Sequence, residues 1–161
     1  TSFAMARALY PGSFDPVTFG HLDLVDRALR LFDSVTVAAA ENITKQPVFS
    51  LAERLHLLKQ VLPAKVEVST FRGLVVDHCR THGFDVIIRG LRTMSDFEYE
   101  YQMAMTNRHL NPHVETVFVM PSLQFSYVSS SLIKDVVRNG GDVSAYLPPA
   151  VDQALRSKLE Q

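Results

Sequence analysis

The sequence predicts an α/β protein: a Rossmann-like, doubly wound sheet of five parallel strands with helices on both faces, in a single domain. Short apolar, β-branched segments alternate along the chain with segments whose apolar residues recur at helical spacing. Five such alternations favour a parallel sheet, and right-handed crossovers then place helices on both of its faces. The length of 161 residues suits one hydrophobic core.

Each expected element follows from its apolar spacing and from the residues that bound it. Pro11-Gly12 ends the first apolar run, Ser50 and Glu53 form a capping box, and Gly83 is a typical helix stop. The expected strands are residues 5–10, 34–40, 65–70, 85–90 and 115–120. The expected helices are residues 21–32, 51–62, 74–82, about 96–109, 131–139 and 148–160. The chain contains no internal repeat and no low-complexity linker.

Composition limits the classes of partner. The formal net charge is -1, with 47% hydrophobic and 20% charged residues, so the overall balance gives no sign of a nucleic-acid or membrane partner. The single cysteine, Cys79, excludes an internal disulfide framework and fits a reducing compartment. We therefore expect a cytoplasmic protein. We also expect Met5 to be the natural start, residues 1–4 to be a cloning remnant, and residues 5–161 to form the domain.

The loop after the first expected strand, "YPGSFDPVTFGH", has the composition of a phosphate site. Gly12 and Gly20 allow close backbone approach, and Ser13 adds a hydroxyl. The following helix start offers free N–H groups and a positive dipole end, and His21 can donate a hydrogen bond to a phosphoryl oxygen. The alternative is ordinary turn chemistry with His21 exposed to solvent. Asp15 is expected to hold the loop through local hydrogen bonds.

Anion-binding residue types follow other expected strands as well. Arg89 and Arg92 follow the fourth strand and suit a polyphosphate, although Asp96, Glu98 or Glu100 could instead pair with them. The serines 129–131 begin a late helix and offer a second anion-binding helix start with Lys134 one turn inside it, or a plain N-cap. Lys45 follows the second strand, although a lone lysine in a loop is more often simply solvated. In a parallel sheet these strand ends share one edge, which favours a phosphate site there.

These stretches resemble a known family. "TFGH" (18–21) resembles the [HT]xGH motif of nucleotidyltransferases, and "YVSSSLIK" resembles their serine-rich second motif. The block "IIRGLRTMSDFEYEYQ", together with "VFVMPS" and "GGDVSAYLP", resembles more narrowly the bacterial phosphopantetheine adenylyltransferases. Many members of the wider superfamily carry a threonine and an arginine where this chain has Ser131 and Lys134, a difference that the bacterial branch shares.

The resemblance implies that ATP and 4′-phosphopantetheine react, with Mg²⁺, to give dephospho-coenzyme A and pyrophosphate. It further implies a homohexamer, inhibition by coenzyme A, and Mg²⁺ held through phosphates and water without a protein ligand. The expected catalytic residues are His21, Lys45, Arg89 and Ser13. The expected ATP-binding residues are Ser13, Phe14, His21, Gly90, Leu91, Arg92, Glu100, Phe125, Ser126, Tyr127, Val128, Ser129, Ser130 and Ser131. The expected acceptor-binding residues are Ser13, Lys45, Leu74, Val75, Arg89, Tyr99 and Asn107.

Other functions remain open at this point. A sister nucleotidyltransferase would use another phosphate acceptor, such as a nicotinamide or glycerol phosphate. A non-catalytic nucleotide sensor on the same fold would need no transition-state donor. The following set of residues argues against it: Ser13, His21, Lys45, Arg89 and Arg92. A nucleic-acid-binding module is disfavoured by the net charge and by the lack of an extended basic run.

Overall fold

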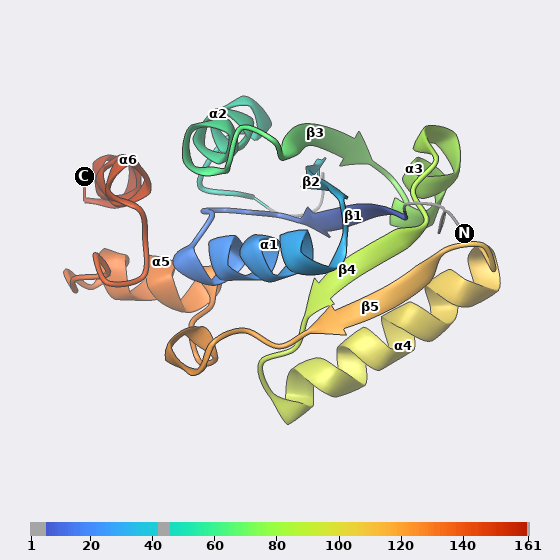
Figure 1. Ribbon diagram of the computed structural model, residues 1–161. Helices are drawn as coiled ribbons and strands as arrows, with labels where there is room; N and C mark the ends of the chain where they lie inside the picture. Colours follow the sequence, from blue (N-terminus) through green and yellow to red (C-terminus); the bar gives the residue numbers. More distant parts are fainter. Residues whose placement is uncertain (1–5, 42–45, 161) are drawn as a thin grey trace.

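All five strands pair in parallel, in the order β3-β2-β1-β4-β5. The computed structural model describes residues 6–41 and 46–160 (Figure 1). The strands are β1 (Arg7–Gly12), β2 (Ser34–Glu41), β3 (Glu67–Arg72), β4 (Val86–Gly90) and β5 (Glu115–Val119). The α-helices are α1 (Phe19–Leu31), α2 (Leu51–Val61), α3 (Val75–His82), α4 (Met94–Leu110), α5 (Ser130–Arg138) and α6 (Pro149–Leu159).

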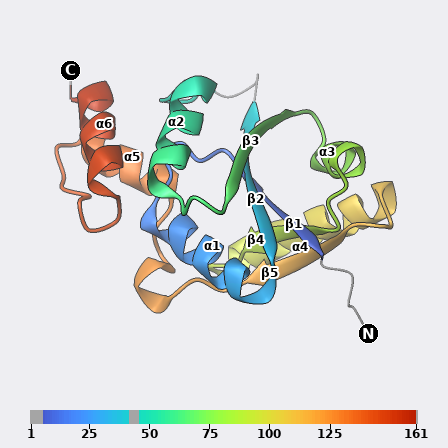
Figure 2. The same cartoon turned by 45° about the horizontal axis from the view of Figure 1, so that its top comes forward.

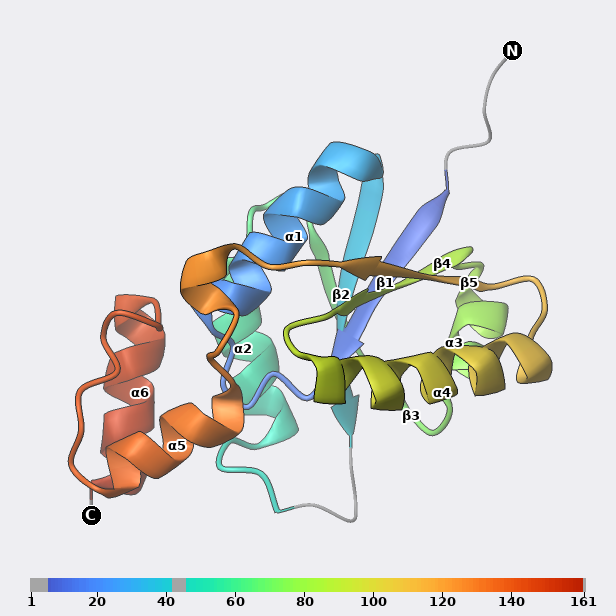
Figure 3. The ribbon, with the colours of Figure 1, turned by 90° about the horizontal axis from the view of Figure 1, so that it is seen from below.

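Side-chain alternation along the strands divides the core into two layers. Ala8 and Tyr10 of β1 face the cluster that includes apolar residues of α1, α2, α5 and α6, whereas Leu9 faces a smaller cluster that includes α3. Figure 3 shows α1 and α2 on one side of the sheet and α3 and α4 on the other. In Figure 2, α6 lies beside α2, and the Lys158–Glu53 ion pair joins these two helices. The predicted fold class is confirmed.

The strand order places a topological switch between β1 and β4. From β1 the chain proceeds outward through β2 to β3, and then crosses back to β4 and β5 on the other side of β1. The connections therefore leave the carboxyl ends of β1 and β4 in opposite directions, and a crevice opens between them. This is the sheet edge at which the sequence predicts a phosphate site.

Several element bounds differ from the sequence-based expectation, most clearly β3, which covers Glu67–Arg72 and not residues 65–70. Three of the differences have a local cause. β1 continues through Pro11 to Gly12 and stays in register with β2. On the other side of β1, β4 pairs only with Ala8 and Leu9, so the missing N–H of Pro11 interrupts no hydrogen bonds between β1 and β4. Helix α1 begins at Phe19, two residues before His21, because the Thr18 side chain accepts a hydrogen bond from the His21 N–H and caps the helix. In the same way Thr93 starts α4 earlier than expected.

Candidate active site

A cleft of about 520 Å³ lies beyond the carboxyl ends of β1 and β4. Its walls are the loop after β1, the first turns of α1 and α5, the segment after β4, and side chains from α2 and α4. The sheet fixes both strand ends, so the two loops and the two helix starts converge on one volume. The cleft therefore occupies the place predicted from the parallel-sheet topology.

Most of the predicted site residues line this cleft. Those that do are Ser13, Phe14, His21, Arg89, Gly90, Arg92, Glu100, Phe125, Val128, Ser129, Ser130 and Ser131. Those that do not are Leu91, Ser126, Tyr127, Leu74, Val75, Tyr99 and Asn107. Leu74 and Val75 lie at the start of α3, at the same carboxyl edge of the sheet. The prediction for Lys45 falls outside the described residues.

His21 is oriented by the backbone at the start of α1. Its Nδ1 accepts a hydrogen bond from the Thr18 N–H at 3.0 Å, and together with the Thr18 side chain it completes a capping box. An N–H can only donate, so Nδ1 is unprotonated and the neutral ring carries its proton on Nε2. Burial, followed by the positive charges of Arg92 and Arg89, lowers the pKa of His21 to about 4. His21 is thus a neutral hydrogen-bond donor through Nε2 at physiological pH.

The rings around His21 hold its plane. Phe14 packs edge-on against it, with ring centroids 4.9 Å apart, and Tyr10 lies at 6.3 Å. Phe14 itself has a φ of 50°, a left-handed conformation that is uncommon outside glycine. The same ring occupies the space beside Gly12, where an added Cβ would come within 3.1 Å of it. In this structure the lack of a side chain at Gly12 therefore makes room for Phe14.

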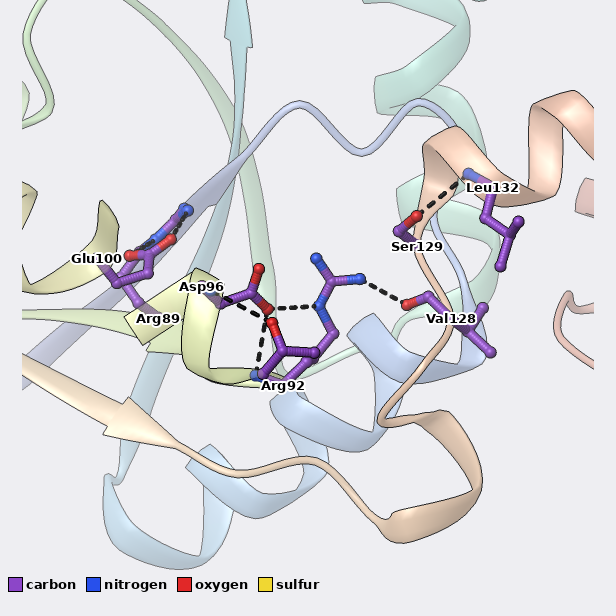
Figure 4. A network of polar contacts seen from close by, with 8 residues as sticks. Arg89, Arg92, Asp96, Glu100, Val128, Ser129 and Leu132 are labelled. Carbon is purple, nitrogen blue, oxygen red and sulfur yellow. Dashed lines mark hydrogen bonds and ion pairs between the residues drawn. The ribbon is translucent and has the colours of Figure 1, made fainter. Parts of the chain in front are cut away.

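Arg89 lines the cleft and is ion-paired, so the ion-pair alternative is confirmed and phosphate binding stays a prediction. Its Nε and Nη2 donate to the two oxygens of Glu100 at 2.9 and 2.7 Å, a bidentate pair. Its Nη1 donates to the Pro11 carbonyl at 2.9 Å. Glu100 is buried on α4, so this pair fixes the guanidinium between β1 and α4 (Figure 4).

Arg92 joins the segment after β4 to the start of α5. Its Nε pairs with Asp96 at 3.2 Å and its Nη1 donates to the Val128 carbonyl at 2.7 Å, as Figure 4 shows. The next residue, Ser129, is the N-cap of α5 and accepts a hydrogen bond from the Leu132 N–H at 3.1 Å. Only Ser129 acts as this cap, because the Ser130 hydroxyl donates instead to the Pro16 carbonyl.

Two further residues shape the cleft, and their roles were missed by the sequence reasoning. Asp15 is buried and accepts hydrogen bonds from the Val48 and Phe49 N–H groups, each at 2.9 Å, and from Lys134 Nζ at 3.2 Å. These contacts span the fold and are not local to the loop, contrary to the expectation for Asp15. Arg54, on α2, lines the cleft and is only 4% exposed. No motif in the sequence marks it, because its contacts with Ser13 and Ala40 join segments that are separate along the chain.

The described residues form neither a metal-binding cluster nor a membrane-spanning helix. No group of three His, Cys, Asp or Glu side chains within residues 6–41 and 46–160 is placed to hold a metal ion. No helix among these same residues is long and apolar enough to cross a membrane.

Comparison with known proteins gives the family. Residues 9–136 match the family described as cytidylyltransferase-like. A phosphopantetheine adenylyltransferase from Opitutus terrae is 51% identical over 155 residues, covering 95% of this chain and 97% of that protein. Proteins of the same name from Geotalea daltonii and Alkaliphilus metalliredigens are each 49% identical over 156 residues, covering 96% of this chain and 97% and 99% of theirs.

Solved structures support the fold. A candidate nicotinate-nucleotide adenylyltransferase from Vibrio parahaemolyticus superposes with a TM-score of 0.68 at 17% identity, covering 96% of this chain and 98% of its own. A lipopolysaccharide core biosynthesis protein from Thermoplasma volcanium GSS1 gives 0.54 at 22% identity, covering 74% of this chain and 98% of its own. With its sheet, its cleft and relatives that match it over almost their full length, the chain belongs to the cytidylyltransferase-like family and, within it, to the phosphopantetheine adenylyltransferases.

Proposed function

We propose that this protein transfers the adenylyl group of ATP to 4′-phosphopantetheine, which gives dephospho-coenzyme A and pyrophosphate, the penultimate step of coenzyme A synthesis. The observation that carries the proposal is His21, a neutral donor held at the mouth of α1 in a cleft that also contains Arg89, Arg92 and the start of α5. The names of the relatives at about 50% identity support the same acceptor.

The chemistry needs stabilisation of charge more than proton transfer. The acceptor phosphate is already an anion, so it attacks the α-phosphorus in line without a general base. Negative charge then spreads over the transferring phosphoryl oxygens. His21 Nε2–H and the free N–H groups of the first turn of α1 are donors suited to those oxygens. No covalent enzyme intermediate is required.

The remaining polar groups divide between the two substrates. Ser13, Lys45 and Arg89 hold the acceptor phosphate close to the α-phosphate, and Arg92 with the start of α5 holds the β- and γ-phosphates. Arg89 keeps N–H groups beyond those used by Glu100 and Pro11, because a guanidinium has five. Gly90 and Glu100 lie on the adenosine side, and Leu74 and Val75 meet the pantetheine arm.

Magnesium enters with the triphosphate in this proposal. The carboxylates that line the cleft, Asp15, Asp96 and Glu100, each already bind a cationic side chain. This donor set fits an ion that keeps its water and binds phosphate oxygens, as Mg²⁺ prefers. The ion would neutralise charge that builds up on the leaving pyrophosphate.

The other expectations for partners and location stay part of the proposal. Coenzyme A contains both the pantetheine arm and an adenine nucleotide, so it would compete for the same cleft. A homohexamer in the cytoplasm is what the resemblance implies. Exposed Phe97 and Tyr101, whose rings stack at 5.9 Å on the outer side of α4, offer apolar surface for such contacts.

The test is pyrophosphate release with ATP and a series of acceptors. We expect rapid release with 4′-phosphopantetheine and little with nicotinate mononucleotide or glycerol phosphate. Preference for one of the latter would replace the proposed acceptor. ATP binding without release in the presence of any acceptor would favour a nucleotide sensor.

A further inference from the structure

The cationic side chains that line the cleft differ in how their charge is balanced. Arg89 pairs with Glu100, Arg92 with Asp96, and Lys134 with Asp15. Arg54 lines the same cleft, yet it forms no ion pair with any described residue. Because His21 is neutral, Arg54 is the positive charge in the described part of the cleft that no protein carboxylate offsets.

Arg54 is also the most deeply buried of these cations. Arg54 is buried, whereas Arg89 and Lys134 are only partly buried and Arg92 is exposed. Its Nη1 donates to the carbonyls of Ser13 and Ala40, at 2.8 and 2.9 Å. Its Nε is buried without a hydrogen-bond partner among the described residues. A guanidinium buried with only neutral acceptors is costly unless an anion lies close by.

The position of Arg54 indicates where that anion binds. Ser13 belongs to the loop after β1, and Ala40 lies near the end of β2, so one Arg54 nitrogen spans the two strand ends on the acceptor side of the cleft. Arg92 follows β4 on the other side of β1, and its contact with the Val128 carbonyl places it beside the segment that leads into α5. A phosphate beside Ser13 would lie near the buried charge, where low polarity strengthens the attraction.

We infer that Arg54 is a specificity-determining residue, whose buried charge selects an acceptor that carries a phosphate at the Ser13 side of the cleft. The inference rests on the proposed function only for the identity of the acceptor. The selection of phosphate over a neutral group follows from the charge itself. The two carbonyl contacts keep the guanidinium in place, so the charge is fixed before the acceptor binds.

The experiment compares the binding of 4′-phosphopantetheine and of unphosphorylated pantetheine by calorimetry. The parent is compared with Arg54→Gln, which keeps a donor for the carbonyls but no charge, and with Arg54→Lys, which keeps the charge. Lys59→Met, on the exposed face of the same helix, is the matched control for loss of one positive charge. Circular dichroism and thermal melting check that each variant is folded.

We expect Arg54→Gln to reduce the preference for the phosphorylated ligand by about tenfold or more, the effect of losing one charge-assisted contact. Arg54→Lys should retain most of that preference, and Lys59→Met should retain all of it. A parent-like preference in folded Arg54→Gln would overturn the inference. If this variant does not fold, ¹⁵N NMR of the Arg54 Nε–H in the parent decides, because the signal should shift with 4′-phosphopantetheine and not with pantetheine.

A third measurement separates this inference from the proposed reaction. Inorganic phosphate should raise the melting temperature of the parent more than that of Arg54→Gln. If it does, and yet no pyrophosphate is released with 4′-phosphopantetheine, then the acceptor is wrong and the role of Arg54 stands. If pyrophosphate is released normally and phosphate stabilises both proteins equally, then the reaction stands and the role of Arg54 is wrong.

Discussion

Helices α1 and α5 begin at the cleft, and their first turns differ from those of the other helices within the described ranges. Neither has an acidic residue in its first turn, whereas α2, α3, α4 and α6 each have one. An acidic side chain at this position stabilises a helix through its dipole, but it would also compete with an anionic ligand. The first turn of α4 also lines the cleft, but its acidic residue, Asp96, is paired with Arg92. The starts of α1 and α5 forgo this stabilisation and leave their N–H groups available to an anion.

The largest effect is expected at the start of α1. In His21→Ala the Nε2–H donor is lost, so kcat for pyrophosphate release should fall by about a hundredfold or more while ATP still binds. Stopped-flow kinetics and ATP calorimetry measure the two effects. Glu53→Ala is the matched control, because Glu53 holds the same third position in the capping box of α2. Turnover near that of the parent in His21→Ala would remove the role assigned to His21.

The start of α5 can be made to resemble the other helices. Ser131→Asp places an acid in its first turn, beside the proposed β,γ-phosphate position, so KM for ATP should rise by about tenfold or more from charge repulsion. Ala52→Asp, in the first turn of α2, should leave this KM unchanged. Steady-state kinetics with varied ATP decide between the two. An equal rise in KM for ATP in both variants would mean that the difference between the two helix starts does not affect ATP binding.

The titration of His21 tests whether its position at the start of α1 keeps the ring neutral. Its pKa of about 4 lies below the usual value of 6.5, so the unfolded chain gains a proton on acidification before the folded protein does. The free energy of unfolding should therefore decrease as the pH falls from 6.5 towards 4, and His21 should contribute no slope above that range. Relative to His21→Asn, the parent should lose on the order of 1 kcal/mol between pH 6.5 and 5. A ring signal that titrates near 6.5 by NMR would contradict this.

The smallest effect separates capping from ligand binding. Ser129→Ala and Ser50→Ala each remove one side-chain cap and should each lower the free energy of unfolding by ~1 kcal/mol in urea titrations. Only Ser129→Ala is expected also to weaken ATP binding, because Ser129 lines the cleft and Ser50 does not. If ATP affinity is the same in both variants, Ser129 is a structural cap and nothing more.

The sequence was sufficient for the architecture and for the edge of the sheet that carries the site. Apolar periodicity is local, and turn residues such as Gly83 and the capping box of Ser50 and Glu53 act within a few positions, so the fold class followed directly. Topology then brought the loop after β1 and the segment after β4 to one cleft. Element starts were less accurate at Thr18 and Thr93, because a cap depends on which side chain reaches which N–H.

The chemical state of the site depended on contacts that only the tertiary structure sets. Asp15 and Lys134 are 119 positions apart, and Arg54 reaches Ser13 across 41 positions, so no sequence spacing reveals either contact. The tautomer of His21 depends on a backbone N–H, and its low pKa depends on burial beside two arginines. The sequence encodes which residue types follow each strand, since apolar periodicity and turn residues act over short distances along the chain. Only the folded chain decided which of their charges are balanced, because ion pairing and burial depend on distances between segments far apart in sequence.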